Sequence, residues 1–129
     1  GISGIIGTVK ERVWKPDLSL LFAGEDNHRE MLRIFVDESR KELSRLHDAL
    51  HGNDRQALRD ILHKNLPLWE TVNLDYPMET LHEIVTTDPD KWQEKQLKEI
   101  YRIEQAASKL VIHVEKMQEE AHEKNNTDN

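Results

Sequence analysis

DRQALRDILHKNLPLWETVN, residues 54–73, combines one apolar stripe with a single central histidine. At about 100° per residue, its apolar side chains fall on one side of a helix, and they are Leu58, Ile61, Leu62, Trp69 and Val72. His63 lies roughly 120° from the centre of that stripe. The pattern therefore predicts a helix over residues 54–73 that buries the stripe and leaves the imidazole of His63 in solvent.

An exposed imidazole on a rigid helix is suited to nucleophilic chemistry. Its ordinary pKa of about 6.5 leaves a large neutral fraction, with a free lone pair, near neutral pH. His63 is therefore a candidate phosphoryl acceptor. The alternative is an ordinary solvated histidine, because the chain has seven histidines and most exposed histidines in proteins have no chemical role.

The flanking sequence predicts further helices. Apolar residues spaced by three and four predict a first long helix from His28 to about Leu50, capped by Asp26 or Asn27. A tight turn at 51–53 follows, in which Gly52 stops one helix and Asn53 or Asp54 starts the next. Two shorter helices are predicted at 18–23, ended by Gly24, and at 77–86. A last, long helix is predicted to begin at Pro89 with Asp88 as its cap, and its apolar stripe ends at Met117.

Four substantial helices joined by short loops, each with one apolar stripe, can bury those stripes against one another. We therefore expect an all-α fold, an up-and-down antiparallel four-helix bundle preceded by the short N-terminal helix. A chain of 129 residues has room for one such domain. We place a linker or the end of a preceding region at 1–15, the bundle at 16–121 and a disordered polar tail at 122–129. Because the chain begins with Gly1, we expect it to be part of a larger protein.

Composition narrows the classes of function. Charged residues make up 33% of the chain and aromatic residues 5%, which favours solvated helices over a sheet. The net charge is −7 and no stretch concentrates lysine and arginine with interleaved aromatic residues, so we expect no nucleic-acid binding. The chain has no cysteine, which excludes disulfides and thiolate sites. No apolar run approaches the ~20 residues of a membrane span, so we expect no membrane contact by this domain.

Three stretches, in this order and spacing, resemble a known family. The first is LLFAGED at 20–26 with MLRIFV at 31–36, the second is ALHGNDRQAL at 49–58, and the third is HKNLP at 63–67. From Asp17 to about Glu120 the chain resembles a histidine-containing phosphotransfer (HPt) domain, the relay module of multistep two-component signalling. The third stretch is similar to the His-Lys-x-Leu-Pro variety found at the ends of bacterial hybrid sensor histidine kinases.

The resemblance implies that His63 accepts a phosphoryl group from a receiver-domain aspartate of the same hybrid kinase. It then implies transfer to the aspartate of a response regulator, the second expected partner. Such a domain is a phosphoryl carrier without kinase or phosphatase activity and without a cofactor or metal of its own, since the Mg²⁺ belongs to the receiver. The resemblance also implies a monomeric, cytoplasmic domain of a bacterial protein, attached to a kinase that can itself be membrane-anchored.

The sequence departs from the commoner family pattern, in which lysine follows the histidine by three residues and glycine by four. Here these positions hold Leu66 and Pro67. Lys64 cannot simply replace that lysine, because one residue turns a helix by about 100°. Arg59, four residues before His63, shares its face and is the better candidate to place charge beside a phosphoryl oxygen. We expect docking to use Arg59, Leu66, Pro67 and Glu70, together with side chains of the first long helix.

Pro67 and Asn65 are unusual in this helix. Pro67 has no N–H to donate to the carbonyl of His63, so the helix should bend near Pro67 under tertiary packing, or stop and restart there. Our hypothesis is that its compact ring leaves the approach to His63 open, as glycine does in relatives. Asn65 points toward the apolar stripe, so we expect a neighbouring side chain or water to satisfy its amide.

Two further functions remain open from the sequence. One is a helical domain that binds receivers but is not phosphorylated, which the missing lysine and glycine favour. The other is an oligomerisation module in which the stripe ending at Met117 forms an intermolecular coiled coil. His47 and His51, four residues apart, could share a metal ion, but the sequence implies no third ligand and we expect no metal site.

Overall fold

The computed structural model describes residues 13–22 and 27–127, with side chains up to Glu120. Within these residues every regular element is helical and no strand occurs, which confirms the all-α class for the described part of the chain. In order, the elements are α2 (Ser19–Phe22), α3 (His28–His51), α4 (Arg55–Thr71), α5 (Met78–Thr86), the 3₁₀ turn η1 (Pro89–Lys91) and α6 (Glu94–Thr127).

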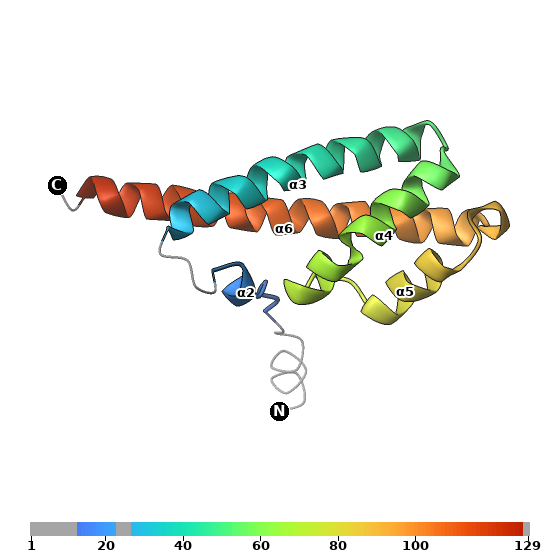
Figure 1. Ribbon diagram of the computed structural model, residues 1–129, viewed down its shortest axis with the longest axis horizontal. Coiled ribbons are helices and arrows are strands. Elements are labelled where there is room, and N and C mark those ends of the chain that lie inside the picture. The colour runs from blue at the N-terminus through green and yellow to red at the C-terminus, as the bar shows by residue number, and fades with distance from the viewer. Residues whose placement is uncertain (1–12, 23–26, 128–129) are drawn as a thin grey trace, which may run out of the picture.

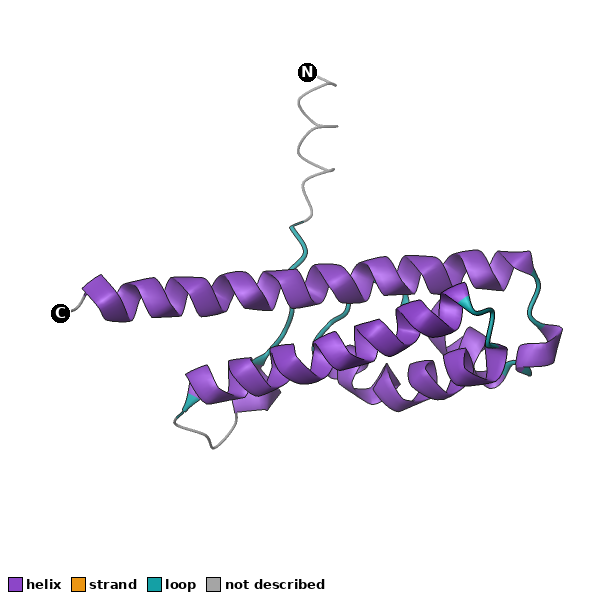
Figure 2. Ribbon diagram, turned by 90° about the horizontal axis from the view of Figure 1, so that it is seen from above, coloured by secondary structure: helices purple, strands orange, loops and turns teal. Residues whose placement is uncertain are grey.

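The two longest helices, α3 and α6, lie side by side and run in opposite directions (Figures 1 and 2). α4 turns back from the end of α3 and contacts both α3 and α5. The short α2 packs against α3, and η1 contacts α4. Other elements therefore cover α4 on more than one side, and only the remaining part of its surface can be exposed to solvent.

A side-chain cap begins each of the helices α3 and α4. The Asn27 side chain accepts a hydrogen bond from the Glu30 amide at 3.1 Å and caps α3. The Asp54 side chain does the same for the Ala57 amide at 3.1 Å and caps α4. Between the two helices Asn53 adopts φ 52°, a left-handed conformation that asparagine tolerates better than most residues. The predicted tight turn and both of these caps are confirmed, whereas the alternative cap Asp26 lies outside the described residues.

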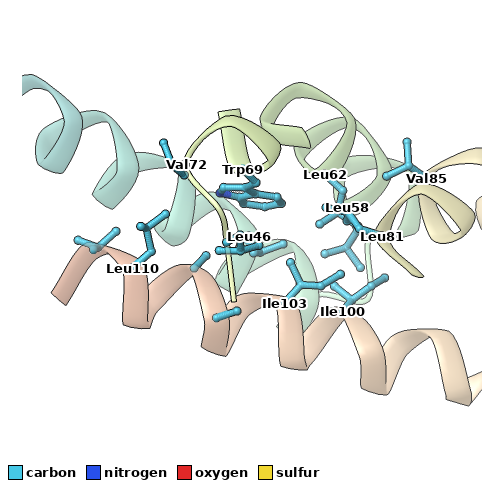
Figure 3. Packing of buried hydrophobic residues seen from close by; sticks show 14 of the residues in the cluster. Leu46, Leu58, Leu62, Trp69, Val72, Leu81, Val85, Ile100, Ile103 and Leu110 are labelled. Carbon is cyan, nitrogen blue, oxygen red and sulfur yellow. The ribbon is translucent and has the colours of Figure 1, made fainter. Parts of the chain in front are cut away.

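Apolar side chains of α3, α4, α5 and α6 meet in one core, part of which is shown in Figure 3. The predicted stripe of α4 is buried, except that Ile61 is half-buried. The stripe of α6 is also buried within this chain, through Ile100, Ile103, Ala107, Leu110, Val111 and Val114. Most of the side chains that an intermolecular coiled coil of α6 would need are therefore already packed inside the protein, and Met117 at the end of the predicted stripe is half-buried.

The long C-terminal helix begins later than the sequence predicts. Asp88 caps only the 3₁₀ turn η1, the chain is extended at Trp92, and α6 starts at Glu94. The reason is the burial of Trp92, whose indole Nε1 donates to the Ile84 carbonyl at 3.2 Å. The prediction of an uninterrupted helix from Pro89 is therefore wrong. The chain leaves the helical conformation at Trp92, where the indole is buried in the core.

Both ends of the described chain differ from the predicted boundaries. The backbone of α6 is helical to Thr127 and therefore extends over residues 122–127 of the predicted tail; good helix formers such as Glu119, Glu120 and Ala121 continue the helix. At the other end, the predicted helix at 18–23 is observed over Ser19–Phe22. Predictions for residues 1–12, for 23–26, including the stop at Gly24, and for 128–129 lie outside the described residues.

Part of the predicted linker packs on the helices. The Trp14 indole donates to the Asn73 carbonyl at 2.7 Å, and the Asn73 amide donates to the Lys15 carbonyl at 2.9 Å. The Trp14 ring also meets the His113 ring of α6 edge to face, with 5.6 Å between their centroids. Residues 14 and 15 therefore belong to the folded unit. None of the described helices is both long and apolar enough to cross a bilayer.

Leu62 ties the helix that carries His63 to the core, and its side chain is 0% exposed. We expect Leu62→Ala to lower the free energy of unfolding by about 2–5 kcal/mol, because it leaves a cavity between packed helices. Urea denaturation measures this loss. Ile112→Ala is the control, because Ile112 is 44% exposed and should change stability by only about 0.5 kcal/mol. Equal losses in the two variants would contradict the core assignment.

Candidate functional site

His63 lies in the middle of α4 with its side chain exposed, directly after the fully buried Leu62. Its predicted exposure is confirmed. Within the described residues its ring forms no ion pair, in contrast to the rings of His47 and His82, which face Glu104 and Glu70. The imidazole is therefore accessible on a helix whose neighbouring turns are held in the core.

α4 continues from Arg55 to Thr71 with Pro67 inside it, so the predicted alternative of a stop and restart at Pro67 is wrong. Pro67 is exposed, as is His63 one turn earlier. Because proline has no N–H, the His63 carbonyl lacks its usual donor within the helix. The buried Leu62 and Trp69 lie on either side of this turn, and their packing offsets the missing hydrogen bond.

Asn65, two residues after His63, is 7% exposed, and its amide is satisfied as expected. The Nδ2 atom donates to Glu42 Oε1 of α3 at 2.9 Å and to the Ile61 carbonyl at 2.8 Å. Sequence reasoning did not identify Glu42. The available signal was its position four residues before the buried Leu46, which places a carboxylate beside the apolar face of α3.

Lys64 also turns toward α3. Its Nζ lies 3.2 Å from Glu42 Oε1, and Arg45 Nη1 lies 3.0 Å from Glu42 Oε2. Burial raises the pKa of Glu42, but the hydrogen bonds from Asn65 and Lys64 and the charges of Lys64 and Arg45 outweigh it. The pKa of this carboxyl therefore lies below its ordinary value, and Glu42 is ionised in the folded protein near neutral pH.

The remaining predicted site residues lie elsewhere along α4. Arg59 is half-buried and, within the described part of the chain, forms no ion pair. Leu66 is half-buried against the core, and Glu70 is exposed with Oε1 3.0 Å from His82 Nε2 of α5. Lys64 and Glu70 are thus engaged by different neighbouring helices, while His63 and Pro67 are exposed to solvent.

A groove of about 320 Å³ adjoins this part of α4. Side chains of α2, α3 and α4 line it, and Ile34 on its wall is partly exposed. Its apolar lining is Leu21, Met31, Ile34, Phe35 and Leu68, and its charged lining is Glu38, Glu42 and Lys64. The neighbour of His63 in sequence, Lys64, therefore also borders an apolar surface that a partner can cover.

His47 and His51, which could share a metal ion by their spacing, lie close together on α3. The rings of His47 and His51 have centroids 4.0 Å apart, and their Nδ1 atoms face Glu104 Oε2 at 3.3 Å and the His47 carbonyl at 3.0 Å, respectively. Within the described residues, no three side chains of His, Cys, Asp or Glu are grouped so as to hold a metal ion.

No family model, curated protein or solved structure matches this chain. The resemblance to phosphotransfer domains therefore stays a prediction from the sequence.

The lowered pKa of Glu42 predicts how its contribution to stability depends on pH. The stabilisation is complete above the ordinary carboxyl pKa of about 4.3, and it is lost as the pH falls through the lower pKa of the folded state. We expect Glu42→Gln to be less stable than the parent at neutral pH, and the difference to shrink on acidification. Urea denaturation over a pH series measures it.

The matched control for this series is Glu38→Gln. Glu38 lies one turn earlier on α3, is well exposed and, among the described residues, pairs only with Lys41, so the stability difference should be small at every pH. A Glu42→Gln deficit that stays constant or grows in acid would contradict the assignment.

Proposed function

We propose that this chain is a phosphoryl carrier of a two-component phosphorelay, with His63 as the phosphorylated residue. The observation that carries the proposal is the exposed imidazole of His63 on a continuous helix, next to the buried Leu62 and close to the buried Asn65, with no ion pair to any described residue. We further propose that α3, α4, α5 and α6 correspond to the four helices of the up-and-down bundle expected for a phosphotransfer domain.

The proposed chemistry consists of two in-line transfers. The lone pair of one imidazole nitrogen of His63 attacks the phosphorus of a receiver's aspartyl phosphate, so that a P–N bond forms while the P–O bond breaks and the aspartate leaves as a carboxylate. A carboxylate of a second receiver later attacks the same phosphorus and releases the imidazole. The receiver supplies Mg²⁺ and its acidic pocket, which neutralise the phosphoryl oxygens. This domain supplies the nucleophile and has no kinase or phosphatase activity.

The docking surface follows from the side chains around His63. Pro67 is exposed on the same face, and the groove between α3 and α4, which Lys64 and Leu68 line, provides apolar area on the adjoining side of α4. Arg59 lies four residues before His63 and has no competing ion pair among the described residues, so its guanidinium is available to a phosphoryl oxygen. Leu66 and Glu70 complete the surface toward α5. Transfer between receivers requires a modest, transient contact.

A receiver-binding domain that is not phosphorylated is the second candidate. It is favoured by Leu66 and Pro67, which stand where most members of the resembled family have lysine and glycine. Binding of a phosphorylated receiver without transfer of its phosphate would identify this function. Oligomerisation through α6 is disfavoured, because its apolar stripe is buried in the chain's own core.

Substitution of His63 tests the proposal. We expect His63→Gln to fold normally, because the side chain is exposed, and to take up no label from a phosphorylated receiver. The label on the parent protein should be acid-labile and alkali-stable, as expected for a phosphoramidate. His51→Gln, which changes an exposed histidine at the C-terminal end of α3, should be labelled normally. Unchanged labelling of His63→Gln would refute the assignment.

Pro67 tests the accessibility of the ring. We expect Pro67→Gly to transfer phosphate at nearly the parental rate, because both residues leave the approach to His63 uncovered. Pro67→Lys should slow transfer by about ten-fold or more, because a long side chain one turn on displaces the receiver from reacting distance. Stopped reactions with a labelled receiver give the rates. A large loss in a well-folded Pro67→Gly would contradict this role of the ring.

A further inference from the structure

One carboxylate of α3 contacts both residues that follow His63. Glu42 Oε1 accepts a hydrogen bond from Asn65 Nδ2 at 2.9 Å and lies 3.2 Å from Lys64 Nζ. These contacts connect α3 to α4 within two residues of the imidazole. Glu42 itself touches no atom that would react in the proposed transfer, so any role it has must act through the position of the helix turn.

The two contacts differ in strength. Lys64 is 63% exposed, and ion pairs at such positions contribute little because water and salt screen them. The Glu42 side chain is only 13% exposed, and Asn65 is buried. A hydrogen bond to an ionised group is stronger than a neutral one, and the low local dielectric strengthens it further. The hydrogen bond between Asn65 and Glu42 is therefore the contact that holds this turn.

This turn needs a restraint from outside the helix. Pro67 removes the backbone hydrogen bond that would otherwise close the turn from His63, so the helix there is held by one bond fewer. Asn65 Nδ2 bonds the Ile61 carbonyl before His63 as well as Glu42. Its amide thereby links the preceding turn of α4 to α3 at the point where the helix's own hydrogen bonding is incomplete.

We propose that Glu42 is a positioning residue for His63, which acts through Asn65 to fix the turn of α4 that carries the imidazole. The inference rests on the proposed function insofar as the turn is fixed for phosphoryl transfer. In-line attack requires the ring nitrogen to be held near reacting distance of the phosphorus, and small displacements of a nucleophile cost rate steeply. Glu42 thus provides, from a different helix, the restraint that Pro67 takes away.

Amide hydrogen exchange tests the restraint without any phosphate transfer. We expect Glu42→Ala to raise the exchange rates of the amides at 63–66 by about ten-fold or more, because this turn opens locally, while the amide of Leu58 changes little. The exchange rates in Glu42→Gln should lie closer to those of the parent than to those of Glu42→Ala, because the amide oxygen of the glutamine still accepts a hydrogen bond from Asn65. Glu38 lies on the same helix and lines the same groove. Glu38→Ala should leave the exchange rates of these amides unchanged.

Single-turnover transfer from a phosphorylated receiver gives the second measurement. Glu42→Ala should lower the rate constant at saturating receiver by about ten-fold, and Glu42→Gln should restore it. Exchange in Glu42→Ala that matches Glu38→Ala, or that rises uniformly along α4, would overturn the inference, as would transfer at the parental rate. If the parent itself takes up no label, the proposed function fails, and exchange alone then decides whether Glu42 fixes the turn.

Discussion

Burial of the apolar stripe of α4 is the constraint on which the rest of the structure depends. Leu58, Leu62, Trp69 and Val72 pack into the core formed with α3, α5 and α6, and each such side chain contributes about 1.5–3 kcal/mol when it is fully buried. Together they determine how α4 is rotated about its axis. The exposure of His63 is a consequence of that rotation, because His63 lies roughly 120° around the helix from the centre of the stripe.

The residues that break local rules gather around His63. A proline lies inside a continuous helix, which costs about 3 kcal/mol in an isolated helix, and an asparagine occupies a buried position two residues after the histidine. Neither choice favours the stability of α4, and both are compensated from outside the helix, by core packing and by Glu42 of α3. Local conflicts of this kind are expected at functional sites, which agrees with the role proposed for His63.

Local patterns predicted the parts of the structure that local physics determines. Periodicity predicted the core stripes and the exposure of His63. The turn residues predicted the turn at Gly52, and side-chain chemistry predicted the caps Asn27 and Asp54. The features that were missed depend on contacts between different elements of the fold. The chain breaks at Trp92 because its indole reaches the core near Ile84, and Glu42 pairs with Asn65 across two helices. The function rests on His63 and its surroundings together with a sequence resemblance, and therefore remains a proposal.

The central claim is that one exposed imidazole of this protein becomes phosphorylated. Nuclear magnetic resonance of the imidazole nitrogens tests it most directly, because it observes all seven histidines in one sample. When a receiver and its phosphodonor are added, we predict that the ring resonances of His63 move to the position of a phosphohistidine and those of the other six histidines do not. A spectrum in which no histidine is modified, or in which a different one is, would contradict the account.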